Sequence, residues 1–158
     1  MLRLDTGRSD TFPAFATELR DVLSTRFGRE TFDHLVNNAG IGLHAPYAET
    51  TEAQYDELFA VNVKGPFFLT QVLAPLIADG GRVLDVSSGL ARLTRAGASA
   101  YAATKGAIEV LTRYQAVELG ARGVRVNVLV PGAVATDSTA LSSATPRHCR
   151  RRSCRPSP

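Results

Sequence analysis

Three stretches of the chain place apolar residues at the three- and four-residue spacing of an amphipathic helix. This periodicity predicts helices over residues 11–27, 52–78 and 99–119. Thr51 is a suitable N-cap for the second helix, and Pro66 is expected to bend that helix near Asn62. Gly80 and Gly81 are expected to end it.

Short apolar runs between these helices are typical of buried strands. They lie at residues 34–36, 82–86 and 124–130. The alternation of strands and helices predicts an α/β fold with a parallel sheet covered by helices. In such folds a ligand binds at the carboxyl ends of the strands.

Length and composition indicate one globular domain. The chain has 158 residues, of which 44% are hydrophobic and 21% are charged. The sequence has no apolar run near the roughly 18 residues that a membrane span requires. The first residues carry no apolar core of a signal peptide, so we expect a cytoplasmic protein with no membrane partner.

The net charge of +3 comes from the last twelve residues, which hold five arginines and no acidic residue. Residues 1–146 hold 13 basic and 15 acidic residues, so nucleic-acid binding is not expected of the globular part. Residues 138–158 are nearly free of large apolar side chains and are expected to be disordered. Cys149 and Cys154 lie in this tail and are interpreted as ordinary thiols, because a zinc site needs more ligands. No metal is therefore expected.

A tyrosine and a lysine lie four residues apart on the third predicted helix, which places them on one face. A free phenol is a poor acid or base near neutral pH, and a nearby ammonium stabilises the phenolate. Tyr101 and Lys105 could therefore exchange a proton with a carbonyl or alcohol oxygen, although this spacing is also common in simple surface pairs. Ser87 and Ser88 could hold that oxygen or only form a turn. Asn62 could bind water or a lysine, or only tolerate the bend.

Five motifs occur in order along the chain. They are NNAG at 37–40, VNVKG around Asn62, DVSS at 85–88, YAATK at 101–105, and VRVNVLVPG at 124–132 followed by Val134 and Thr136. In this order the sequence resembles the short-chain dehydrogenase/reductase family, which moves hydride between NAD or NADP and a carbonyl or alcohol. The resemblance spans residues 1–137 and implies a partial Rossmann-like, doubly wound parallel sheet with flanking helices.

The resemblance also implies roles for the matching residues. Tyr101 is the general acid in reduction and the general base in oxidation, and Lys105 holds the nicotinamide ribose and favours the phenolate. Ser88, thirteen residues before Tyr101, orients the substrate oxygen, and Asn62 positions a water that links Lys105 to solvent. The other implied cofactor-binding residues are Asp5 and Thr6 beside the adenine, Asn38, Ala39 and Gly40 in the cleft wall, and Val134 and Thr136 near the nicotinamide amide.

Part of the family pattern is absent from the sequence. The phosphate-binding TGxxxGxG loop does not occur, since the TG at residues 6–7 is not followed by the required glycines. By the resemblance, residues 2–4 are the third strand of the family fold, so the first βαβ unit is missing, and the pattern ends again after Thr136. We therefore expect a domain truncated at both ends, with an exposed edge on the NNAG strand and most of the diphosphate site lost.

Three functions remain open at this point. The first is an NAD(P)-dependent oxidoreductase acting on a small-molecule carbonyl or alcohol. The second is a non-catalytic fragment that forms a homo-oligomer through helices 52–78 and 99–119, which the resemblance implies as a subunit interface. The third is a nucleic-acid or membrane-surface arm formed by the arginine-rich tail, for which an unstructured tail is the favoured alternative.

Overall fold

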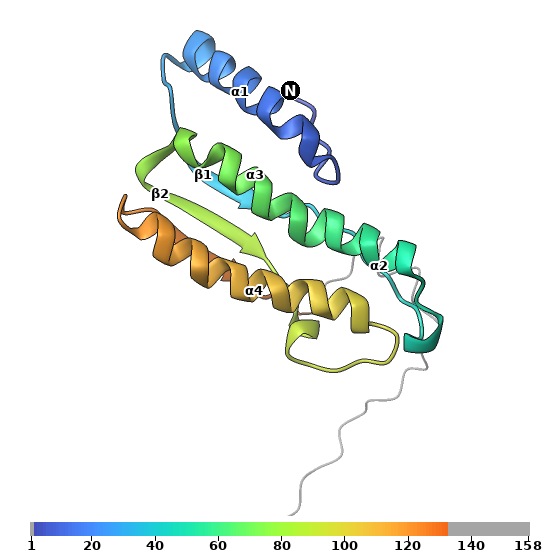
Figure 1. Cartoon of the computed structure of the whole chain (residues 1–158). Coiled ribbons are helices and arrows are strands. Elements are labelled where there is room, and N and C mark those ends of the chain that lie inside the picture. Colours follow the sequence, from blue (N-terminus) through green and yellow to red (C-terminus); the bar gives the residue numbers. More distant parts are fainter. Residues whose placement is uncertain (1, 133–158) are drawn as a thin grey trace, which may run out of the picture.

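Three parallel strands form the sheet of the computed structural model, which describes residues 2–132. β1 (Phe32–Asn37), β2 (Ile77–Val86) and β3 (Arg125–Leu129) lie in the order β1-β2-β3. Asn37 at the end of β1 is opposite Asp85 on β2. The carboxyl ends of the strands therefore meet at one rim, and the predicted parallel sheet with flanking helices is confirmed (Figure 1).

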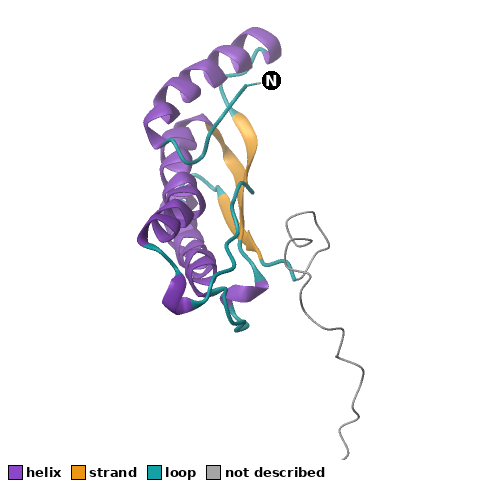
Figure 2. Ribbon diagram, turned by 90° about the vertical axis from the view of Figure 1, so that its right-hand side faces the viewer, coloured by secondary structure: helices purple, strands orange, loops and turns teal. Residues whose placement is uncertain are grey.

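Four α-helices account for about half of the remaining described residues. They are α1 (Phe12–Phe27), α2 (Glu52–Phe59), α3 (Gly65–Leu73) and α4 (Ser99–Gly120). Figure 2 shows the helices gathered on one side of the sheet. α4 packs against β2 and β3, whereas α1 packs against α3 beyond the β1 edge. The predictions for 11–27 and 99–119 are confirmed to within one residue at each end.

The second predicted helix, residues 52–78, is divided near its middle. A π-helical turn, Ala60–Lys64, separates α2 from α3. Pro66 has no N–H, so the carbonyl of Asn62 lacks its α-helical partner and the helical ladder is interrupted. The bend predicted near Asn62 coincides with this π-helical turn, in which Asn62 is buried, with 1% of its surface exposed.

The two ends of this helical region differ in how well they were predicted. The N-cap at Thr51 is confirmed, because its side chain takes part in a capping box. The expectation that Gly80 and Gly81 end the helix is wrong, since α3 ends at Leu73 and a short proline-containing turn leads into β2 at Ile77. Gly81 instead lies within β2, where a Cβ would be 2.7 Å from a carbonyl oxygen.

Residues 2–4 do not form the strand that the resemblance implies. Leu4 packs against the cluster of α1 and α3 side chains instead of pairing with β1. The carbonyl of Thr6 lies so close to α3 that a Cβ on Gly65 would overlap it. The opening segment, residues 2–7, thus packs on α1 and α3 and does not pair with β1. β1 therefore remains the edge of the described sheet, as expected for the NNAG strand.

Two apolar clusters hold the elements together. One lies between α1, α3 and β1, and the other between β2, β3 and α4. Their buried members are Phe12, Ala16, Leu69, Leu73 and Leu76 in the first, and Ile77, Val83, Val124 and Val126 in the second. None of the helices in residues 2–132 has the length and apolar character needed to span a bilayer. Val134, Thr136 and the tail 138–158 lie outside the described residues.

Candidate functional site

Polar side chains from four segments gather at the carboxyl rim of the sheet. Asn38 follows β1, and Ser88 follows β2. Tyr101 and Lys105 lie in the first half of α4, and Asn62 lies in the π-helical turn. The hydrogen bonds of Lys105 and Asn62 join these segments into one site.

Lys105 lies at the centre of this site, with 5% of its surface exposed. Its Nζ donates to the carbonyl of Val86 at 2.8 Å and lies 5.7 Å from the centroid of the Tyr101 ring. That separation is within the range of a cation–π contact. Burial lowers the pKa of Lys105, and the charge of an ionised Asp85 would oppose this. The ammonium therefore has one donor fixed on the strand and lies beside the phenol, as the spacing of Tyr101 and Lys105 predicts.

Asn62 holds the loop that follows β1. Its Oδ1 accepts from the amide of Ile41 at 2.9 Å, and its Nδ2 donates to the carbonyl of Ile41 at 2.9 Å and to Thr104 Oγ1 at 3.2 Å. A Cβ on Gly40 would lie 3.1 Å from Asn62 Oδ1 and 3.5 Å from Lys105 Nζ. The loop backbone can approach the lysine this closely because residue 40 is glycine.

The two serines after β2 have different surroundings. Ser87 is buried, and its hydroxyl is within 3.1 Å of both the Lys105 carbonyl and Glu109. Ser88 is half-buried, and its Oγ accepts from the amide of Leu90 at 3.2 Å, which leaves its own proton for another acceptor. Ser87 thus fastens the strand end to α4, whereas Ser88 lies half-buried at the rim, and its role toward a substrate stays a prediction from the family resemblance.

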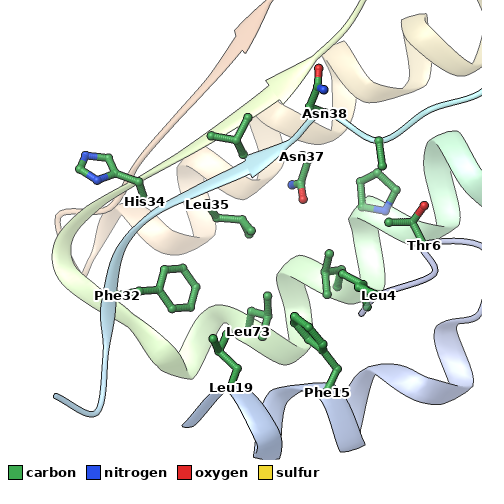
Figure 3. Close-up of a pocket in the computed structure, with 14 residues that line it drawn as sticks. Leu4, Thr6, Phe15, Leu19, Phe32, His34, Leu35, Asn37, Asn38 and Leu73 are labelled. Atoms are coloured by element: carbon green, nitrogen blue, oxygen red, sulfur yellow. The ribbon is translucent and has the colours of Figure 1, made fainter. Parts of the chain in front are cut away.

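The residues expected along the cofactor cleft are only partly brought together. Thr6, Asn38 and Ala39 line a pocket of about 400 Å³ at the free edge of β1. Figure 3 shows Thr6 and Leu4 facing β1 across this pocket. Asp5 is exposed and accepts from the amide of Gly7 at 2.9 Å, so it shapes the turn before α1.

Three polar residues at the site were missed by the sequence reasoning. Thr104 joins Asn62 to the carbonyl of Tyr101, since its hydroxyl donates to that carbonyl at 2.7 Å. Glu109 accepts from Ser87 and pairs with an arginine at 3.1 Å. Asp85 is fully buried beneath the rim. Glu109 lies four residues after Lys105, and Asp85 interrupts an apolar strand, so both carried a signal in the sequence.

Comparisons with known proteins identify the family of the chain. Residues 11–153 match the family described as Enoyl-(Acyl carrier protein) reductase. The crystal structure of a short-chain dehydrogenase from Streptomyces avermitilis is 39% identical, with a TM-score of 0.74 over 86% of this chain and 48% of that chain. The chain belongs to the short-chain dehydrogenase/reductase family. The resemblance carried by the five motifs is thereby confirmed.

Other relatives agree with this family. Gluconate 5-dehydrogenase of Gluconobacter oxydans is 39% identical over 109 residues, which are 68% of this chain and 43% of the relative. A short chain dehydrogenase from Burkholderia cenocepacia J2315, solved in complex with NADP, is 33% identical with a TM-score of 0.77 over 87% of this chain and 54% of that chain. The chain therefore spans about half the length of the relatives it matches.

The described residues fit one end of a nicotinamide cofactor. Toward the rest of residues 2–132, the buried Lys105 ammonium uses one of its three donors, and the glycine at position 40 leaves the backbone close beside it. These features suit the hydroxyl groups of a ribose at the nicotinamide end. For the diphosphate end, the sequence contains no TGxxxGxG loop, and none of the residues from 2 to 132 supplies a glycine-rich turn of that kind.

Proposed function

We propose that this chain carries the proton-transfer half of an NAD(P)-dependent oxidoreductase that interconverts a carbonyl and an alcohol on a small-molecule substrate. The supporting observation is the buried Lys105 ammonium, 5.7 Å from the Tyr101 ring and hydrogen-bonded to the end of β2. A cation held against a phenol at the ligand-binding rim of a parallel sheet suits acid–base work on an oxygen atom.

Tyr101 moves the proton in this proposal. In reduction its O–H bond breaks as the proton passes to the carbonyl oxygen, which becomes the hydroxyl of the alcohol. In oxidation the phenolate takes that proton back. The Lys105 ammonium stabilises the phenolate in both directions. The bound cofactor supplies or accepts the hydride at the substrate carbon.

Ser88 and Asn62 complete the proton path. The Ser88 hydroxyl accepts from the amide of Leu90, which leaves its own proton for the substrate oxygen. Both Nδ2 protons of Asn62 are used inside the protein, which leaves the second lone pair of Oδ1 for a water that links Lys105 to solvent. Asn62 therefore serves the relay as an acceptor and as the anchor of the Ile41 loop.

NAD or NADP is the proposed cofactor, and a similar structure holds NADP. Lys105 and Tyr101 would hold the nicotinamide ribose at the rim. The other cofactor-binding positions are proposed because they match the family motifs. The remaining proposed positions are Asn38, Ala39 and Gly40 in the wall, Asp5 and Thr6 toward the adenine, and Val134 and Thr136 near the nicotinamide amide.

Paired tyrosine variants test this proposal. NAD(P)H-linked reduction of a panel of aldehydes and ketones is measured for the wild type, Tyr101→Phe and Tyr114→Phe. Tyr114 lies on the same helix but is 65% exposed and outside the site. We expect Tyr101→Phe to lower turnover by about 10²- to 10⁴-fold, and Tyr114→Phe to retain it. Equal rates for the wild type and Tyr101→Phe would refute the role of Tyr101.

A second candidate function, assembly without catalysis, rests on exposed apolar side chains of α3 and α4. Figure 1 shows these helices side by side. A shallow groove lined by Phe67 and Phe68 lies on α3 and the neighbouring π-helical turn. The exposed apolar residues of this α3–α4 surface are Phe67, Phe68, Val110, Tyr114 and Val117. Burying such side chains against a second copy would remove them from water, so we propose a homo-oligomer through this surface.

Light scattering after size-exclusion chromatography tests the assembly. Val117→Glu places a charge on the α3–α4 surface, where Val117 is 80% exposed. The control Leu93→Glu places a charge on a loop, where Leu93 is 70% exposed. We expect Val117→Glu to produce a monomer and Leu93→Glu to retain the wild-type mass. An unchanged mass for Val117→Glu would exclude this surface. Assembly together with no turnover and no NAD(P)H binding would favour the non-catalytic function.

A further inference from the structure

A carboxyl group lies at the centre of a polar cluster beneath the site. The Asp85 side chain is fully buried, and its Oδ1 accepts from Asn37 Nδ2 at 2.8 Å. Its Oδ2 lies 2.8 Å from Thr112 Oγ1, and Asn37 also donates to Thr70 at 2.9 Å. The cluster thus joins β1, α3, β2 and α4, and the proposed proton path uses none of its side chains.

Counting protons indicates the state of this carboxyl group. The Thr112 hydroxyl has one proton and lies 2.8 Å from two oxygens, Asp85 Oδ2 and the carbonyl of Ile108. An ionised Asp85 would be a buried carboxylate with two hydrogen bonds, and within the described residues no cationic nitrogen lies within 4.0 Å of it. Such a group is costly to bury.

A protonated Asp85 gives both of its own oxygens and the Thr112 hydroxyl a hydrogen-bond partner. In that state the carboxyl O–H would donate to Thr112 Oγ1, and the Thr112 hydroxyl would donate to the carbonyl of Ile108. Asn37 would donate to the other carboxyl oxygen. Burial also raises the pKa of Asp85, against the hydrogen bonds from Asn37 and Thr112 and the charge of Lys105. Lys105 is the ionisable group that acts on it, since Asn37 from β1, Thr70 from α3 and Thr112 from α4 are uncharged.

The cluster also fixes the position of Lys105. Thr112 lies seven residues after Lys105, which is two helical turns, so both side chains face β2. Asp85 meets Thr112, and the carbonyl of the next strand residue, Val86, accepts from Lys105 Nζ. The contact between Asp85 and Thr112 therefore sets how far α4 lies along β2, and with it the place of the ammonium.

We propose that Asp85 is a positioning residue, held as a neutral carboxylic acid, whose bond to Thr112 fixes α4 on β2 and places Lys105 and Tyr101 at the rim. This role of Asp85 rests on the proposed function of Tyr101 and Lys105.

The protonation state is tested by a ¹³C NMR titration of aspartate-labelled protein. All the other aspartates among residues 2–132 are exposed, so a buried one is recognised in the wild type without a variant. We expect one carboxyl signal to stay at the position of a carboxylic acid at neutral pH, where an aspartate with the ordinary pKa of about 3.9 is ionised. A carboxylate position for every signal at neutral pH would overturn the proposal.

The positioning role is tested on the lysine signals, which require no catalysis. Lys64 and Lys105 are the two lysines of the chain, so ¹⁵N-lysine labelling gives two Nζ signals. Asp85→Asn keeps a donor toward Thr112 and an acceptor for Asn37, and we expect it to leave the titration of Lys105 unchanged. A fall in the pKa of Lys105 in this variant would show instead that Asp85 is ionised.

Two threonine variants supply the matched comparison. Thr112→Val and Thr70→Val each remove one buried hydroxyl, and only Thr112 contacts Asp85. We expect Thr112→Val to shift the Lys105 signal and Thr70→Val to leave it in place. A Lys105 signal that is the same in both variants would refute the positioning role. Loss of turnover plays no part in these readouts, so they can fail or succeed independently of the proposed function.

Discussion

Replacing Gly65 by alanine tests how the opening segment is held against α3. The carbonyl of Thr6 occupies the space that a Cβ on Gly65 would need, so the opening segment must move away from the helix. Crowding of this kind in a packed interior costs about 1–3 kcal/mol. The backbone angles at Gly65 are those of an ordinary helical residue, so the cost arises from the contact alone.

Gly106 supplies a control with the opposite sign. It lies in the middle of α4, and a Cβ there would meet no atom within 4 Å. Gly106→Ala therefore gains only the helix propensity of alanine, about 0.8–1 kcal/mol. Two identical substitutions in helices of one protein are thus expected to change stability in opposite directions.

Thermal unfolding followed by circular dichroism measures both effects. For a domain of this size, 1 kcal/mol corresponds to about 4 °C in Tm. We expect Gly65→Ala to melt at a lower temperature than the wild type and Gly106→Ala at a higher one. If Gly65→Ala is as stable as Gly106→Ala, the opening segment does not pack on α3, and the placement of Thr6 beside β1 is wrong.

Three further changes have defined outcomes. Asn62→Ala removes the partner of both the amide and the carbonyl of Ile41 and should lower the free energy of unfolding, measured in urea, by about 2–3 kcal/mol. The control Asn127→Ala, on the exposed side of β3, should lower it by less than about 0.5 kcal/mol. Equal losses would contradict the role of Asn62 as an anchor. Gly97→Ala should lower the free energy of unfolding by about 1–3 kcal/mol, because φ at Gly97 is +78° and a Cβ there would lie 2.7 Å from His44 Nδ1. Adding His44→Ala to this variant should recover part of the loss. No recovery would show that His44 does not pack against residue 97. The pKa of Asp85 is higher in the folded chain than in the unfolded one, so its contribution to stability is full below the unfolded pKa of about 3.9 and is lost as pH rises through the folded pKa. Asp85→Asn should remove this part of the pH dependence of stability. An unchanged pH dependence would contradict the raised pKa of Asp85.

The sequence pattern correctly predicted the elements that are determined by neighbouring residues, such as helix periodicity and a helix N-cap. The periodicity of residues 99–119 was sufficient for α4, because its buried face packs on β2 and β3. Thr51 was recognisable because a capping box is formed within three residues. Gly80 and Gly81 were wrongly predicted to end a helix. Gly81 is needed because another part of the folded chain lies close to it in β2, and the sequence around it does not reveal such a contact.

The candidate site divides in the same way. The placing of Tyr101 and Lys105 on one helix face follows from their spacing, whereas their roles and the choice of Ser88 rest on the family resemblance. The contact between Asn62 and Thr104 joins residues 42 positions apart, and that between Asp85 and Thr112 joins residues 27 positions apart. Such contacts depend on how α4 lies across the strand ends, which the sequence pattern does not specify.

Calorimetric titration of the chain with NADPH tests the central claim, that the Lys105 site binds a nicotinamide cofactor. The other lysine, Lys64, is exposed and provides the matched variant. We expect saturable binding by the wild type and by Lys64→Met, with affinity lowered by about tenfold or more in Lys105→Met because a charge-assisted contact is lost. Equal binding by Lys105→Met and the wild type, or no binding by the wild type, would contradict the account.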